Sequence, residues 1–137
     1  MKHSIHFLKG FHLIEILIVL AIVGILAAFS IPLYSQYRMQ ERRQEAAQIL
    51  SQLAIAMEKY QVEQNTYQDA TLNLLHFKEL IADHRYQLII QSATENDYFL
   101  VAKPLETQAE NDPCGALTLN AKGEKGITGT EKIEDCW

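Results

Sequence analysis

The sequence predicts an α+β fold in which a long N-terminal helix packs on a small antiparallel β-sheet. Three observations predict it. Residues 16–37 form an uncharged, strongly apolar run of 22 positions, whereas residues 38–137 carry 10 basic and 16 acidic side chains. The apolar run is followed by a stripe of apolar residues at helical spacing. Beyond that stripe, short segments rich in Tyr, Phe, Ile and Val alternate with turn residues, as β-strands do.

Length and charge limit the possible classes of protein. A chain of 137 residues with two cysteines is expected to form one domain. Its formal charge of −5 argues against a surface that neutralises nucleic-acid phosphates. An apolar end joined to a charged body excludes a plain cytosolic globule.

The first ten residues resemble an export signal in their charge order. They contain Lys2 and Lys9 but no acid, and the apolar run follows almost at once. Three interpretations compete. A secretory signal would be cut after the apolar run, for which Ala28-Phe29-Ser30 offers a site. A permanent anchor would remain uncut, and a leader cut before the run would leave the run on the mature chain.

Glu15 distinguishes these interpretations. A carboxylate costs about 2.5–3.5 kcal/mol near the centre of a bilayer and less near an interface. An ordinary secretory signal or membrane anchor does not require a carboxylate here. Alternatively, Glu15 lies close enough to the charged leader to reach the membrane interface, where it would need no partner. The functional interpretation requires a positively charged partner inside the membrane or inside an assembly.

A known family shares this arrangement. Gly10-Phe11, Leu13-Ile14-Glu15 and an apolar run containing Gly24 and Pro32 resemble the class III signal of type IV pilins and pseudopilins across residues 1–37. His12 departs from the family, which usually has threonine there. Asp112-Pro113-Cys114-Gly115 and the Cys136-Trp137 ending resemble the PilE-like minor pilins of the type IVa system.

The resemblance implies a processing route and an assembly contact. Prepilin peptidase would remove residues 1–10 by cutting between Gly10 and Phe11, and would methylate the new Phe11 amine. Glu15 would then pair with the N-terminal amine of a neighbouring subunit, which fits the physics because a buried carboxylate is tolerated when it faces an ammonium.

The resemblance also implies partners and a location. The partners are other pilin subunits, prepilin peptidase, the inner-membrane pilus assembly machinery, and membrane lipid before assembly. The subunit would cross the inner membrane once with its head in the periplasm, and would then join an extracellular pilus.

The long helix is expected to continue beyond the apolar run. The apolar stripe that predicts it consists of Ala46, Leu50, Leu53, Met57 and Tyr60. A helix over residues 11–63 would be roughly 80 Å long, and its first half, residues 11–37, is long enough to cross a membrane. Gly24 and Pro32 are weak points. They predict a gentle kink or, as the family suggests, local melting between them in the fibre.

Residues 38–137 are expected to form the globular head. Its parts are the amphipathic half-helix 38–63, a loop over 64–83 with a short helix near Thr71, and a sheet and disulfide region over 84–137. Expected strands cover 84–93, 97–103 and 114–121, and residues 127–133 form an edge strand or a loop. The first two strands form a hairpin, and short connections make the sheet antiparallel.

Cys114 and Cys136 both lie in the exported half, which favours a disulfide over two free thiols. Closing a loop of about 23 residues stabilises a small domain by roughly 3 kcal/mol in the chain-entropy model. The bridge would also match the disulfide-closed C-terminal loop of type IV pilins. A metal site is disfavoured because neither cysteine has a further cysteine or histidine at ligand spacing.

The sequence predicts a structural protein rather than an enzyme. It contains no nucleophile motif, phosphate loop or metal cluster, so no cofactor and no metal are expected. His76 and His84 are isolated, and Asp69, Asp83, Asp97 and Asp112 are acids scattered through turns. The predicted function is a structural, minor subunit of a type IV pilus, with adhesion, twitching motility and DNA uptake as roles known for the family.

Two alternatives to the filament subunit remain open. One is a DNA-uptake competence pilin receptor. Lys122, Lys125 and Lys132 could contact nucleic acid, but four acids share their loop and a mixed-charge solvated loop is favoured. The other is a type II secretion pseudopilin, against which the two cysteines argue.

Overall fold

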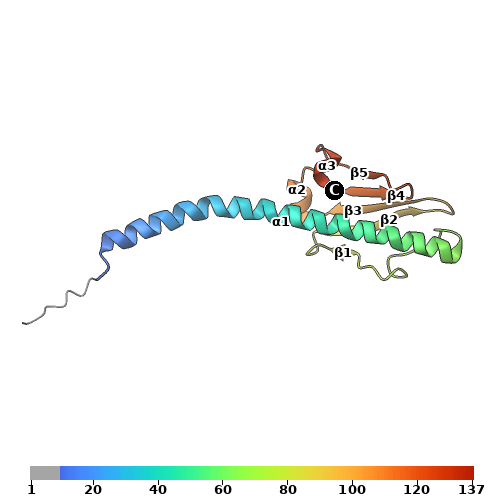
Figure 1. Cartoon of the computed structure of the whole chain (residues 1–137), viewed down its shortest axis with the longest axis horizontal. Helices are drawn as coiled ribbons and strands as arrows, with labels where there is room; N and C mark the ends of the chain where they lie inside the picture. Colours follow the sequence, from blue (N-terminus) through green and yellow to red (C-terminus); the bar gives the residue numbers. More distant parts are fainter. Residues whose placement is uncertain (1–9) are drawn as a thin grey trace, which may run out of the picture. The chain divides into compact units, whose positions relative to one another are not determined.

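The computed structural model describes residues 10–137, so the leader prediction for residues 1–9 lies outside the described residues. The chain divides into two compact units, Met1–Tyr37 and Arg38–Trp137. Within residues 10–137, three helices and five strands follow one another (Figure 1): α1 (Leu13–Gln64), β1 (Leu80–Ile81), β2 (Tyr86–Ala93), β3 (Tyr98–Pro104), α2 (Glu106–Asn111), β4 (Leu117–Asn120), β5 (Lys125–Ile127) and α3 (Ile133–Cys136).

Within the described residues, the first unit contains the N-terminal half of α1, preceded by residues 10–12. The helix is continuous for 52 residues and contains Pro32 in its interior, as the prediction of an uninterrupted helix requires. All side chains from residue 10 to residue 37 are exposed. By length and composition, this part of α1 could span a membrane. No part of the described chain therefore buries the apolar side chains of residues 10–37.

The second unit is built on a five-stranded antiparallel sheet in the order β1-β2-β3-β4-β5. The predicted β2–β3 hairpin is confirmed, and the Thr94 N–H donates to the Asp97 carbonyl across its turn at 2.8 Å. Pro104 ends β3, as expected, because proline has no N–H for a longer ladder.

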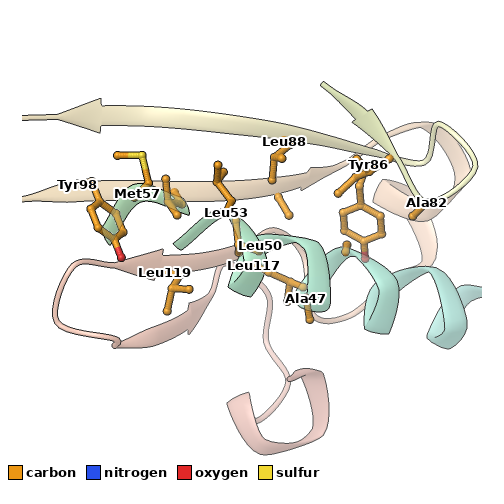
Figure 2. Close-up of a cluster of buried hydrophobic side chains, with 14 of the residues drawn as sticks. Ala47, Leu50, Leu53, Met57, Ala82, Tyr86, Leu88, Tyr98, Leu117 and Leu119 are labelled. Carbon is orange, nitrogen blue, oxygen red and sulfur yellow. The ribbon is translucent and has the colours of Figure 1, made fainter. Parts of the chain in front are cut away.

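The hydrophobic core lies between α1 and one face of the sheet (Figure 2). Leu50, Leu53 and Met57 from the predicted stripe have no exposed surface, and they pack in one cluster with buried residues of the sheet such as Leu88 and Leu117. Each element covers the apolar face that the other cannot bury alone. The prediction that the sheet packs on the amphipathic half of the helix is confirmed.

The short elements differ from the prediction. The prediction of a short helix near Thr71 is wrong, because residues 72–76 form successive turns and His76 adopts a positive φ of 62°. The two-residue strand β1 lies inside the segment expected to be loop. Helices α2 and α3, with six and four residues, were not predicted. Such elements are too short to show a hydrophobic period.

Candidate functional site

Glu15 lies in the first turn of α1, close to the expected cleavage point. The His12 backbone N–H donates to the Glu15 carboxylate at 3.2 Å. This is the contact made by the acidic residue of a capping box, and a negative charge is favourable at this end of a helix. Gly10, Phe11, His12 and Glu15 line a hollow of about 270 Å³. The structure thus brings together the residues expected to be processed and the residue expected to direct assembly.

Gly24 and Pro32 both lie within the continuous helix. A Cβ atom added at Gly24 would have no neighbour within 4 Å, so packing in the described chain gives no reason for a glycine. Pro32 lacks an N–H, which removes the donor that the Ala28 carbonyl would otherwise receive. The Ser30 hydroxyl donates to the Leu26 carbonyl at 2.7 Å in the same turn. The helix therefore has weakened backbone bonding here while remaining helical.

A buried ion pair joins α1 to the segment that precedes Cys114. Arg43 Nη1 lies 2.7 Å from Asp112 Oδ1, and these two side chains are 9% and 0% exposed, respectively. The Cys114 N–H donates to the same Asp112 oxygen at 3.0 Å. A buried ion pair is sustained only when further hydrogen bonds satisfy its atoms. Asp112 has such bonds, and it links the helix to the start of the disulfide loop.

Two more buried side chains complete this network. The Tyr86 hydroxyl donates to Asp112 Oδ2 at 3.0 Å. The Gln108 amide nitrogen lies 2.9 Å from Asp112 Oδ2, 3.1 Å from the Tyr86 hydroxyl and 3.0 Å from the Met39 carbonyl. We call Arg43, Tyr86, Gln108 and Asp112 the polar network. It connects α1, β2 and α2, and through Asp112 it contacts the backbone of Cys114, where the disulfide loop starts.

The disulfide loop is closed as predicted. Cys114 and Cys136 are bonded with their Cα atoms 5.8 Å apart. Gly129 passes so close to the start of the loop that an added Cβ would lie 1.9 Å from the Pro113 carbonyl oxygen, so only glycine fits there. The Gly129 N–H donates to the Cys114 carbonyl at 2.9 Å. Backbone bonds and the bridge together fix the C-terminal tail.

The sequence interpretation missed the polar network. The predicted stripe did not include Arg43, and Asp112 was grouped with the acids scattered through turns, whereas both side chains are buried. One signal was present. Arg43 lies three residues before Ala46, so it continues the apolar stripe by one more helical step. A charged residue in register with a buried stripe indicates a buried partner.

A second polar cluster lies at the far end of the core. The Glu58 carboxylate accepts hydrogen bonds from the hydroxyls of Tyr67 at 3.0 Å and Tyr98 at 3.2 Å, and the two rings meet edge to face. Burial raises the pKa of Tyr98, and the negative charge of Glu58 raises it further. Burial and the Glu58 hydrogen bond raise the pKa of Tyr67 in the same way. Burial, followed by the charge of Asp112, raises the pKa of Tyr86.

The head is expected to lose stability as the pH rises above about 10. Above that pH the unfolded chain releases the phenol protons, whereas the folded state keeps them. The contribution of these tyrosines to the free energy of unfolding is therefore fully present below about pH 10 and is lost as the pH rises above it. The slope is up to about 1.4 kcal/mol per pH unit for each such tyrosine. Urea unfolding of the chain between about pH 8 and about pH 11 measures it. Tyr98→Phe should show a shallower slope, and an unchanged slope would contradict this account.

Sequence comparisons identify relatives of this chain. A family model described as "Type IV minor pilin ComP, DNA uptake sequence receptor" matches residues 32–118. The chain is 35% identical over 124 residues to the type IV wide pilus major component PilA4 of Thermus thermophilus, covering 89% of this chain and 87% of that protein. It is 31% identical over 106 residues to the type IV major pilin protein PilA of Myxococcus xanthus, covering 77% of this chain and 47% of that protein. The match thus spans about half of the Myxococcus relative.

A solved structure agrees with the fold. The non-core minor pilin PilV of Neisseria meningitidis superposes with a TM-score of 0.51 at 23% identity, covering 67% of this chain and 91% of that chain. The likeness concerns the helix-on-sheet architecture. The family model matches more than half of the chain, and PilA4 is similar over most of both proteins. The chain therefore belongs to the type IV pilin family.

Proposed function

We propose that this chain is a minor-type structural subunit of a type IV pilus. It is held in the inner membrane with its head in the periplasm, and is then built into an extracellular filament with other pilin subunits. The observation that carries the proposal is the exposed apolar half of α1, with Glu15 near its start. An apolar surface of this extent needs lipid or other subunits to cover it.

Glu15 sets the position of the subunit in the filament. Inside an apolar assembly its carboxylate requires a cation, and the Phe11 amine released by cleavage is a cation that every neighbouring subunit carries. The Cys114–Cys136 bridge argues against the pseudopilin alternative, as it does from sequence.

Gly10→Ala is expected to block processing. The peptidase would then leave residues 1–10 in place, and the subunit would retain Lys2 and Lys9. The Phe11 amine, which pairs with Glu15 in this proposal, would never form, so entry into filaments would fall at least tenfold. Intact mass and N-terminal sequence of the membrane-extracted chain show whether residues 1–10 have been removed.

The unchanged chain is the reference for this experiment. It should begin at a methylated Phe11. If the Gly10→Ala chain also begins at Phe11, cleavage does not require glycine at position 10 and this prediction is wrong. A start at Ile31 in the unchanged chain would indicate ordinary signal peptidase and would overturn the proposed function.

A second candidate function is a receptor for DNA during uptake. The family model with that description matches residues 32–118, which is the observation in its favour. In the adjoining loop Lys122 and Lys125 are exposed, and the Lys125 ammonium lies 5.0 Å from the centre of the Trp137 ring. A cation beside an aromatic ring is a feature that nucleic-acid surfaces use.

Fluorescence anisotropy with double-stranded DNA tests this candidate. Binding by the detergent-solubilised chain should weaken steeply with added salt, because released counterions drive phosphate binding. Lys122→Ala and Lys125→Ala should each weaken it, whereas Lys78→Ala, an exposed control between the turns over residues 72–76 and β1, should not. Absence of binding at low salt would remove the receptor function and leave the filament function standing.

A further inference from the structure

Two arginines at the start of the head part of α1 share one carboxylate. Asp83, in the turn between β1 and β2, has its Oδ2 atom 2.7 Å from Arg38 Nη2 and 3.6 Å from Arg42 Nε. Arg38 and Arg42 are four residues apart, so their side chains lie on the same face of the helix. Within the described chain, the Arg42 Nε atom is buried and has no hydrogen-bond partner. The negative charge of Asp83 compensates this nitrogen.

The adjacent face of the same helical turn is joined to another part of the head. Arg43 follows Arg42 by one residue, which places its side chain about 100° further around the helix. It forms the buried pair with Asp112, and the Gln108 amide nitrogen donates to the Met39 carbonyl at 3.0 Å. Contacts from two distant parts of the head therefore meet on residues 38–43. We call residues 38–43 the clamp segment.

The turn that carries Asp83 has a strained backbone. Ala82, Asp83 and His84 adopt φ values of 52°, 57° and 60° in succession. This left-handed conformation is costly for residues other than glycine, and it persists where the surrounding structure over-determines it. Ala82 is buried, whereas the Asp83 side chain is 58% exposed and forms its ion pairs with α1. The strained turn thus places a carboxylate against the helix.

The clamp segment lies between a weak part of α1 and the hydrophobic core. Pro32 deprives the Ala28 carbonyl of its helical donor, and the side chains of residues 31–37 are exposed. Opening spreads easily along a helix once it has started, because each further residue gives up only one hydrogen bond. The buried apolar stripe begins at Ala46. Residues 38–42 contribute no buried apolar side chain, so polar contacts must hold this part of the helix.

We propose that the clamp segment stops any opening of α1 from spreading into the head. The polar network anchors Arg43, and Asp83 holds the helical turn that precedes it. A helix fixed on two adjacent faces cannot unwind there without breaking both sets of contacts. This conformational device concerns the opening of a single chain, so it stands or falls independently of the proposed filament function.

Hydrogen–deuterium exchange of the detergent-solubilised full-length chain, followed by mass spectrometry, tests the proposal. Ser35→Pro opens the helix beside the clamp segment, at an exposed position, because proline removes a backbone hydrogen bond. With this change alone, amide exchange over residues 39–46 should differ less than twofold from that of the unchanged chain. Asp83→Asn removes the charge but keeps a residue that tolerates a left-handed turn. The two changes together should speed exchange over residues 39–46 at least fivefold.

Asp69→Asn is the matched control, because Asp69 is also an exposed aspartate with a positive φ, 66°. Combined with Ser35→Pro, it should leave exchange over residues 39–46 as Ser35→Pro alone does. Amides of β3 should keep their exchange rates in every variant, which separates local opening from general loss of stability.

A second comparison avoids the added proline. In a chain that keeps Ser35, Asp83→Asn should speed exchange over residues 38–42 at least threefold, and adding Arg38→Gln should speed it no further, because the shared ion pair is already lost. Fast exchange over residues 39–46 with Ser35→Pro alone would overturn the clamp. Equal effects of Asp69→Asn and Asp83→Asn, or parallel acceleration in β3, would also overturn it.

Discussion

Replacing Asp112 with alanine is expected to lower the free energy of unfolding of the head by about 3–5 kcal/mol. The change leaves the Arg43 guanidinium buried without its counter-ion, since that side chain is 9% exposed. It also removes acceptors from the Tyr86 hydroxyl and the Cys114 N–H. Urea unfolding of the detergent-solubilised chain, followed by near-ultraviolet circular dichroism, measures the loss. The midpoint of thermal unfolding should fall by more than about 12 °C.

Two comparisons isolate the cause. Asp135→Ala removes the same charge from an exposed position and should change stability by less than about 0.5 kcal/mol. Arg43→Met combined with Asp112→Ala should recover part of the loss, because the unpaired buried charge is then gone. If Asp112→Ala resembles Asp135→Ala, the polar network contributes nothing to stability and the ion pair is incidental.

Long elements could be predicted from sequence because they repeat a simple pattern many times. The stripe from Ala46 to Tyr60 marks the buried side of α1 over four turns, and the β2–β3 hairpin combines strand residues with a compact turn. The disulfide followed from the export signal and the cysteine count. By contrast, β1, α2 and α3 contain between two and six residues, and they depend on contacts with the rest of the head rather than on a period of their own.

The candidate site residues also differ in how far they could be predicted from the sequence. Gly10, Phe11 and Glu15 lie within six residues of one another, so their register was visible in the sequence. Arg43 and Asp112 are 69 residues apart, and no local pattern around Asp112 predicts that its carboxylate is buried against an arginine. Folding brings these two residues together. The only sign of this in the sequence is that Arg43 continues the helical stripe of buried residues. The hydrogen bond from the His12 N–H to the Glu15 carboxylate likewise could not be predicted from the sequence.

Glu15→Ala is expected to leave processing intact and to lower the amount of the chain in sheared filaments at least tenfold. In the filament proposed above, loss of the carboxylate would leave a neighbour's Phe11 amine without a counter-ion. Removing one partner of a buried ion pair costs about 3–5 kcal/mol, which is a factor of at least 100 in an equilibrium. Quantitative immunoblots of filament and membrane fractions measure the distribution, and the mass of the membrane form reports processing. Glu45→Ala, at an exposed position in the head half of α1, is the matched control.

Glu15→Gln separates pairing from helix capping. In the structure the Glu15 carboxylate accepts a hydrogen bond from the His12 N–H, so alanine removes a cap as well as a charge. A glutamine carbonyl can still accept that bond, but it carries no charge to offset an ammonium. If charge pairing directs assembly, Glu15→Gln should be excluded from filaments as strongly as Glu15→Ala. If Glu15→Gln enters filaments like the unchanged chain, the residue serves the helix end of its own subunit and the intersubunit pair must be abandoned.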